Sequence, residues 1–239
     1  SGSVFLDDID VLDEKDAVRR MLGYLPQDFG VYPKVTAYDL LDHFAQLKGL
    51  SHRTRRREVV DGLLQQTNLW DVRAQRLGTF SGGMRQRFGI AQALLGDPRL
   101  IIVDEPTAGL DPQERVRFHN LLSDIGEERT VLLSTHIVSD VADLCANMAI
   151  INKGQVLLCG EPQELIYGIE DFIWARFVTK AELPAFQARH SVISSRLLSG
   201  RTLIHVYAED DPGDGFEPAR ASLDDVYFAT IAGRHNPAA

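Results

Sequence analysis

A serine followed by two glycines forms the first group of residues that could bind a ligand. Ser81 is a favoured residue at a helix N-cap, where its hydroxyl accepts a backbone N–H. Gly82 and Gly83 carry no side chain, so a bound group could approach the main chain closely. Because a helix start carries partial positive charge and free N–H groups, this segment could bind an anion.

Two adjacent carboxylates form the second group. Residues 100–103 are Leu, Ile, Ile and Val, a composition suited to a strand that is buried on both faces. Asp104 and Glu105 follow this run directly. Side chains at the carboxyl end of such a strand are placed for chemistry, and a carboxylate there could orient a water molecule and accept its proton.

The pattern around these groups predicts a parallel sheet that is covered by helices. After the strand at 100–103 we expect a helix at 113–125, a strand at 130–133, a helix at 137–145 and a strand at 148–151. Alternation of strand and helix is typical of parallel sheets. Near the N-terminus we expect a strand at 3–6, a polar turn, and a strand at 21–25 that brings Gln27 to the edge of the site.

Two further regions differ from this core. Residues 28–95 are mostly helical in pattern, with helices starting at Thr36, spanning 54–67 and spanning 80–95, which predicts an inserted helical subdomain. Residues 170–239 predict a small α+β appendage of three strands, a short helix, and a last helix that is capped at Ser222. We therefore expect two domains, at 1–165 and 170–239.

Composition excludes several classes of protein. With 239 residues, of which 44% are apolar, the chain can bury one large core and a small appended domain. A net charge of −9 argues against nucleic acid as a partner. No apolar run approaches the roughly 18 residues of a membrane span. For the one basic cluster, Arg53 and Arg55 to Arg57, we favour a solvated helix face over a phosphate or lipid contact.

The order of the motifs resembles that of the nucleotide-binding subunit of ATP-binding cassette (ABC) transporters. Five elements match in sequence order: the Q-loop at 24–27, the signature motif at 80–84, the Walker B strand at 100–106, the D-loop at 108–111, and the strand with the switch histidine at 133–136. The match covers most of residues 1–165. The resemblance implies a P-loop NTPase-like α/β fold with a parallel sheet core, the inserted helical subdomain and the C-terminal appendage.

The resemblance also implies that four of the candidate residues act on the same ATP. Glu105 is expected to be the catalytic base, and His136 is expected to contact the γ-phosphate and steady the attacking water. Asp104 is similar to the aspartate that holds Mg²⁺, usually through a water molecule. Gln27 would offer a second oxygen to the same ion.

The remaining candidates are expected to act on a second ATP. In the family two subunits face each other head to tail, so Ser81, Gly82 and Gly83 would cap the ATP that the facing subunit holds. Asp111 matches the D-loop aspartate, which acts across that interface; its simpler alternative is a helix N-cap before Pro112. We therefore expect a homodimer or a paired cassette subunit.

One family element is absent from this sequence. The phosphate-binding loop has the form G-x-x-x-x-G-K-[ST], and no glycine of this chain is followed by lysine. In the family the loop precedes a segment similar to residues 1–7, so we expect it to lie before Ser1. The 239 residues alone are expected to be inactive.

The resemblance favours one function and leaves two alternatives. The favoured one is an ATPase subunit that powers an exporter through separate integral membrane subunits, contacted by residues 28–48, at the cytoplasmic face of the membrane. The segment 222–228 is similar to the tail of such exporter subunits. The alternatives are a soluble cassette ATPase that acts on ribosomes or DNA, and a regulatory fragment that cannot use nucleotide.

Overall fold

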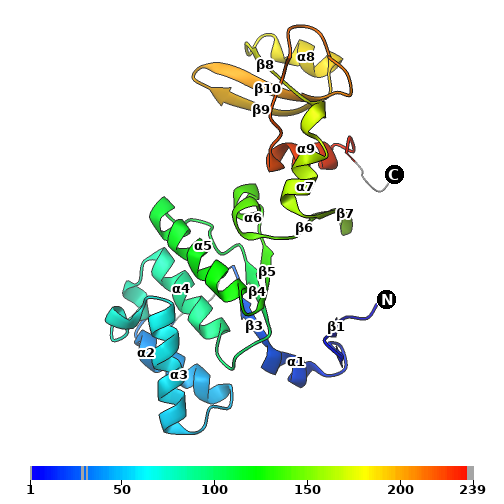
Figure 1. Ribbon diagram of the computed structural model, residues 1–239. Helices are drawn as coiled ribbons and strands as arrows, with labels where there is room; N and C mark the ends of the chain where they lie inside the picture. The colour runs from blue at the N-terminus through cyan, green and yellow to red at the C-terminus, as the bar shows by residue number, and fades with distance from the viewer. Residues whose placement is uncertain (1, 28–29, 31, 236–239) are drawn as a thin grey trace. The chain divides into compact units, whose positions relative to one another are not determined.

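The computed structural model describes residues 2–27, 30 and 32–235. The chain folds into two compact units, Ser1–His136 and Ile137–Ala239. Figure 1 shows both in ribbon form.

A parallel sheet lies at the centre of the first unit. Its strands β3 (Leu22–Leu25), β4 (Leu100–Asp104) and β5 (Thr130–Ser134) are hydrogen-bonded in that order. Leu25 and Val103 are paired in the register and almost fully buried, as a strand covered on both faces requires. The predicted parallel sheet is therefore confirmed for these three strands, and β4 includes one residue more than the apolar run. The strand expected at 148–151 is β6 (Met148–Asn152), which instead pairs antiparallel with β7 (Gln155–Gly160) across a tight turn.

The N-terminal segment differs from its sequence-based expectation. The strand expected at 3–6 is a two-residue strand, β1 (Phe5–Leu6), which pairs antiparallel with β2 (Ile9–Asp10). The segment expected to be a polar turn contains the helix α1 (Lys15–Met21). This helix buries only Val18, so it has almost no apolar periodicity that a sequence pattern could detect.

The expected helical subdomain is present between β3 and β4. Its helices are α2 (Ala37–Leu47), α3 (Arg53–Gln66) and α4 (Gly82–Ala93), with short 3-10 turns η1 (Trp70–Val72) and η2 (Leu77–Thr79). One apolar cluster joins them, and its largest members include Leu41, Leu64 and Phe88, all fully buried. Residues 28, 29 and 31 of the expected segment lie outside the described residues.

The helix α5 (Pro112–Gly126) connects β4 to β5 and completes the first unit. Phe118, Leu122 and Ile125 are buried, which gives the helix one apolar face. Its contacts include both α4 and β5. It therefore packs against both β5 of the sheet and α4 of the helical subdomain.

Up to residue 235, where the described chain ends, the second unit contains a hairpin, an antiparallel sheet and four α-helices. The helices are α6 (Val138–Leu144), α7 (Pro162–Tyr167), α8 (Leu183–Arg189) and α9 (Leu223–Ile231), and the hairpin joins β6 (Met148–Asn152) to β7 (Gln155–Gly160). A 3-10 turn, η3 (Glu170–Phe172), leads into the sheet. The sheet has the order β11 (Glu217–Pro218), β8 (Ile173–Val178), β10 (Arg201–Tyr207) and β9 (Val192–Leu198).

The two units divide at residue 136, well before the boundary that the sequence suggested at 165–170. Ile150 and Leu158 of the hairpin share one buried cluster with Leu165 and Ile169, and with Val226 of α9. Because this cluster spans the expected boundary, residues 137–165 pack with the C-terminal segment. The expected boundary therefore falls inside the second unit.

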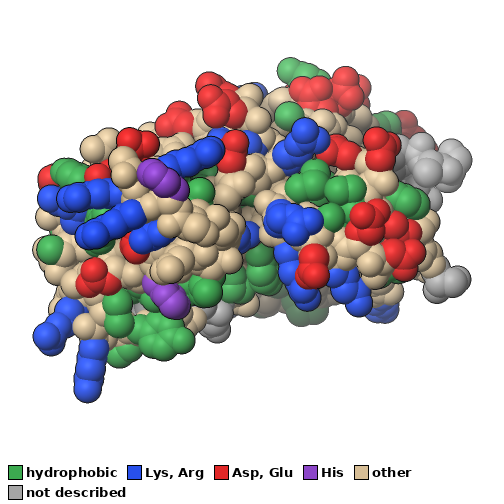
Figure 2. All heavy atoms as spheres, turned by 90° about the horizontal axis from the view of Figure 1, so that it is seen from below, with side chains coloured by type: hydrophobic (Ala, Val, Ile, Leu, Met, Phe, Trp, Pro, Cys, Tyr) green, Lys and Arg blue, Asp and Glu red, His purple; other side chains and the backbone are tan. Residues whose placement is uncertain are grey.

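The surface of the first unit carries both charge signs. Figure 2 shows basic and acidic side chains interspersed on one face. Of the basic cluster, Arg53, Arg55 and Arg57 are exposed, whereas the Nε of Arg56 lies 2.8 Å from Asp42 Oδ1 in a half-buried ion pair. Within the described residues, no helix is both long and apolar enough to cross a membrane.

Candidate functional site

The strand ends of the first unit bring three predicted site segments to one edge of the sheet. In the register Leu25 pairs with Val103, and Asp104 pairs with Ser134. Gln27, Glu105 and His136 each follow one of these three strands within two residues. The carboxyl edge of a parallel sheet is where such folds bind ligands.

Glu105 and His136 are in direct contact at this edge. The imidazole Nδ1 of His136 lies 2.7 Å from Glu105 Oε1, and the backbone N–H of His136 donates to the same oxygen at 2.9 Å. Thr135 Oγ1 lies 3.4 Å from Glu105 Oε2. The Glu105 side chain is 15% exposed, whereas that of His136 is 75% exposed. The carboxylate is thus oriented from one side, and the imidazole remains open to a ligand.

The backbone at Glu105 is unusual and fixes the direction of its side chain. Its φ is +46°, in the left-handed region, which costs a non-glycine residue about 1–2 kcal/mol. The Glu105 N–H donates to Ser134 O at 2.8 Å, which joins the residue to the end of β5. Such strain persists where surrounding contacts determine the conformation, and it is common at functional positions.

Asp104 and Gln27 are suited to part of a magnesium site. Asp104 is half-buried at the end of β4, and Gln27 is exposed beyond β3. Within the described part of the chain, no group of three or more His, Cys, Asp or Glu residues could hold a metal ion. Mg²⁺ commonly binds through one or two carboxylates together with phosphate oxygens and water. One carboxylate and one amide oxygen at the same sheet edge are compatible with such a partial site.

Ser81 forms the helix cap that its sequence predicted. Its Oγ accepts the backbone N–H of Met84 at 3.2 Å, which places Ser81 at the N-cap of α4. Ser81 and Gly82 are exposed and Gly83 is buried. The N-terminus of a twelve-residue helix therefore faces solvent at the predicted anion-binding segment.

Asp111 caps the next helix. Its Oδ1 accepts the backbone N–H of Glu114 at 2.9 Å, and Pro112 occupies the first turn of α5. The simpler of its two predicted roles, an N-cap, is therefore confirmed. Its role across a subunit interface stays a prediction.

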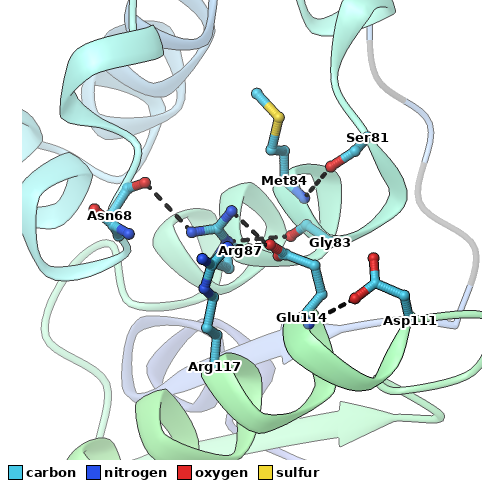
Figure 3. A network of polar contacts seen from close by, with 8 residues as sticks. All are labelled: Asn68, Ser81, Gly83, Met84, Arg87, Asp111, Glu114 and Arg117. Carbon is cyan, nitrogen blue, oxygen red and sulfur yellow. Dashed lines mark hydrogen bonds and ion pairs between the residues drawn. The ribbon is translucent and has the colours of Figure 1, made fainter.

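A polar network that the sequence did not indicate joins these two caps. Figure 3 shows the side chains of Arg87 on α4 and Glu114 on α5 pointing toward each other. Arg87 Nη2 lies 3.2 Å from Glu114 Oε2, and Arg117 Nη1 lies 2.7 Å from Glu114 Oε1. Burial lowers the pKa of the Arg87 guanidinium, and the Glu114 charge opposes that shift. Asp111 and Glu114 follow a cap-like D-x-x-E spacing, but no local pattern indicates the contact with Arg87.

Comparison with known proteins identifies relatives over most of the chain. The family model described as ABC transporter matches residues 1–108. An uncharacterized ABC transporter ATP-binding protein of Bacillus subtilis, YxlF, is 31% identical over 93% of this chain and 80% of its own length. The probable multidrug ABC transporter ATP-binding protein YbhF of Escherichia coli is 32% identical over 69% of this chain. The chain spans only 28% of the length of YbhF.

A solved structure agrees with these sequence matches. The chain is similar to a structure titled as the ATP-binding subunit of an ABC transporter, with a TM-score of 0.59 and 27% identity over 70% of each chain. The linearmycin resistance ATP-binding protein LnrL of Bacillus subtilis is 30% identical over 69% of this chain and 53% of its own length. The chain therefore belongs to the family of ABC transporter ATP-binding proteins.

Proposed function

We propose that this protein is the ATP-hydrolysing subunit of an exporter, that it dimerises around ATP, and that it acts on separate integral membrane subunits at the cytoplasmic face of the membrane. The observation that carries this proposal is the contact of Glu105 with His136 beside Asp104, at the ligand-binding edge of the sheet. Membership of an ATP-binding family supports ATP as the ligand.

Glu105 is the catalytic base in this proposal. Its carboxylate orients a water molecule in line with the γ-phosphate and takes the proton as the oxygen attacks phosphorus. His136 holds that carboxylate through its main chain and through Nδ1. Because Nδ1 faces Glu105, Nε2 is the ring nitrogen left for a phosphate oxygen. The open face of His136 suits this second contact.

Asp104 would hold Mg²⁺ through an oxygen ligand, and Gln27, which follows the neighbouring strand β3, would supply another oxygen. When bound, the ion neutralises negative charge on the phosphates. The phosphate-binding loop of the form G-x-x-x-x-G-K-[ST] does not occur in these 239 residues.

The signature helix acts on the ATP of the facing subunit. The exposed N-terminus of α4, with Ser81, Gly82 and Gly83, suits an anion that arrives from outside the subunit. Asp111 faces the same interface in this proposal. Because each ATP would touch both subunits, nucleotide binding closes the dimer and hydrolysis reopens it.

Export is favoured by the names of two relatives. YbhF is described as a probable multidrug transporter protein and LnrL as a linearmycin resistance protein, and both names fit removal of a compound from the cell. Residues 28–48, which include α2, form the contact with the membrane subunits in this proposal. The net charge of −9 supports a partner other than nucleic acid.

The substitution Glu105→Gln tests the proposal. In the complete gene product the variant should bind ATP and dimerise, because the amide keeps the shape of the side chain. Its turnover should fall by at least about a hundredfold, because the amide cannot accept the proton. Steady-state phosphate release and size-exclusion chromatography with ATP measure the two effects.

A matched control is Glu128→Gln, which neutralises a side chain that is 76% exposed and pairs only with its neighbour Arg129 among the contacts described. Its turnover should equal that of the native protein. Native-like turnover of Glu105→Gln would remove Glu105 from the role of base.

A further inference from the structure

We propose that Glu114 is a positioning residue that fixes the first turn of α4 to the first turn of α5, so that the Ser81–Gly83 segment and Asp111 move as one body. The inference rests on the proposed function, because both segments would act across the dimer interface. It adds a residue that lies between them. Figure 3 shows the two caps and the side chains that connect them.

The first observation is that Glu114 occupies the space beside Gly83. A Cβ atom added at Gly83 would lie 2.3 Å from Glu114 Oε2 and 2.8 Å from its Cδ and Cγ. Real Cβ atoms essentially never approach a neighbour more closely than 3.0 Å. Gly82, in contrast, has nothing within 4 Å of the same position. A side chain at Gly83 would therefore require the Glu114 carboxylate to move, whatever ligand approaches from outside.

The second observation is that both ends of Glu114 are held. Its backbone N–H donates to the cap residue Asp111, and its Oε1 accepts from Arg117 Nη1 at 2.7 Å. Both partners belong to α5 or to its cap. The carboxylate is thus fixed on α5 and is directed at α4.

The third observation is that Arg87 completes the contact from the α4 side. Its Nη2 lies 3.2 Å from Glu114 Oε2, its Nε lies 3.4 Å from Gly83 O, and its Nη1 lies 3.4 Å from Asn68 O. The side chains of Arg87 and Glu114 are 8% and 15% exposed. A close charge pair this well shielded from water is stronger than an exposed pair.

One oxygen of the pair is only loosely satisfied. Glu114 Oε2 is buried and accepts no well-aligned hydrogen bond within the described residues, although Arg87 Nη2 lies nearby. Its position is therefore set by packing against Gly83 and by the Arg87 charge. A shift of α4 would displace this oxygen directly. Through Glu114 it would also displace the Asp111 cap.

The consequence is a link between the two segments of the subunit that would act across the dimer interface. An ATP held by the facing subunit would bind at the α4 N-terminus, and Glu114 would pass a displacement of that turn to Asp111. Glu114 touches neither nucleotide in this account. Loss of the residue should weaken ATP-driven dimerisation while leaving the chemical step intact.

A double-mutant cycle of Gly83→Ala and Glu114→Ala in the complete gene product tests the inference. Glu114→Ala alone should raise the ATP concentration for half-maximal hydrolysis by about tenfold, with kcat changed by less than about twofold. Gly83→Ala alone should cause a larger rise, because its methyl group meets the carboxylate. In the Glu114→Ala background, the additional effect of Gly83→Ala should shrink by about tenfold or more.

Glu114→Gln separates charge from packing. It keeps the atoms that fill the space beside Gly83 and removes the charge that faces Arg87. We expect its effect to lie between native and Glu114→Ala, and we expect no relief of Gly83→Ala. Glu128→Gln serves as the control for loss of one carboxylate.

Two readouts keep this inference distinguishable from the proposed function. The thermal midpoint without nucleotide reports the packing of Gly83 against Glu114, and the ATP dependence reports positioning. Additive effects of the two substitutions on both readouts would overturn the role of Glu114. A native protein that neither hydrolyses ATP nor dimerises with it would instead overturn the proposed function.

Discussion

At the scale of single residues, two backbone contacts help to orient Glu105. Its own N–H donates to Ser134 O, and its carboxylate accepts the N–H of His136. Neither contact requires a particular side chain at the partner position. The imidazole of His136 adds a second contact to the same oxygen, and most of its surface remains exposed. The backbone contacts of Glu105 therefore do not depend on the imidazole, which is expected to contact the γ-phosphate.

The substitution His136→Ala should test whether the imidazole contributes to the reaction independently of the backbone contacts of Glu105. The backbone N–H to Glu105 remains in the variant, so the carboxylate keeps one of its two contacts from this residue. Loss of an imidazole that stabilises developing charge should lower kcat by about a hundredfold to a thousandfold. The thermal midpoint should change little, because the side chain is 75% exposed. Phosphate release and a thermal melt measure the two effects.

His52→Ala provides the control, because His52 is exposed and makes no side-chain cap bond at the start of α3. Its kcat should match that of the native protein. If His136→Ala keeps native turnover, the imidazole has no role in the reaction.

The candidate residues themselves could be predicted from sequence, but their contacts could not. The ends of apolar runs predicted that Gln27, Glu105 and His136 share one edge of a sheet. Whether Glu105 meets His136 depends on the register of β4 with β5 and on a left-handed backbone at Glu105. The pairing of Arg87 with Glu114 depends on how two helices pack. Neither property has a local sequence signal.

At the scale of elements, the last helix of the second unit depends on a buried carboxylate. Ser222 and Asp225 form a capping box at the start of α9, and Asp225 is fully buried. His205 Nδ1 lies 2.8 Å from Asp225 Oδ1, and Ser222 Oγ donates to Oδ2 at 2.6 Å. Burial raises the pKa of Asp225, but the hydrogen bonds from His205 and Ser222 and the His205 charge outweigh it and lower the pKa.

This lowered pKa predicts the pH dependence of the second unit. A carboxyl whose folded pKa lies below its ordinary value of 3.8 stabilises the fold above that value. The stabilisation is lost as the pH falls through the folded pKa. Asp225→Asn should destabilise the unit by about 1–3 kcal/mol near pH 7, and its difference from native should shrink below about pH 4.

Fluorescence can report this unit alone. The chain has two tryptophans, and Trp174 lies on β8 in the second unit, so Trp70→Phe leaves a single reporter there. Asp224→Asn is the matched control, because Asp224 is a half-exposed neighbour that pairs with Arg196 at the surface. An Asp225→Asn variant that unfolds like the control at pH 7 would show that the cap contributes little.

Elements with strong local signals were predicted well. The capping residues Thr36, Ser81 and Ser222 all accept the expected backbone N–H. The short helix α1 was missed, because it carries almost no apolar face. The division at residue 136 was missed because the joint core of Ile150, Leu165 and Val226 is formed by contacts between distant segments.

At the scale of the whole molecule, the described residues supply only part of each expected ATP site. Glu105, His136 and Asp104 would face the γ-phosphate and its metal ion, and Ser81 with Gly83 would face a different ATP. The family element that binds most of the phosphate oxygens is the loop G-x-x-x-x-G-K-[ST], and the sequence does not contain it. The 239 residues alone should therefore bind ATP only weakly.

A polypeptide of these 239 residues alone should show this weak affinity directly. Without the backbone N–H groups and the lysine of the loop, the triphosphate has few positive partners near Asp104 and Glu105, and these carboxylates repel it. We expect no Mg²⁺-dependent ATP binding at about 100 μM nucleotide and no measurable turnover, whereas a polypeptide that also carries a G-x-x-x-x-G-K-[ST] loop should show both. Calorimetric titration checks the binding, and circular dichroism confirms that the shorter polypeptide is folded. Tight, Mg²⁺-dependent binding by the folded 239-residue polypeptide would mean that its own residues form a sufficient phosphate site. The N-terminus of α4 is the anion-binding segment identified among the described residues. The assignment of Ser81 and Gly83 to the ATP of a facing subunit would therefore be the first to be abandoned.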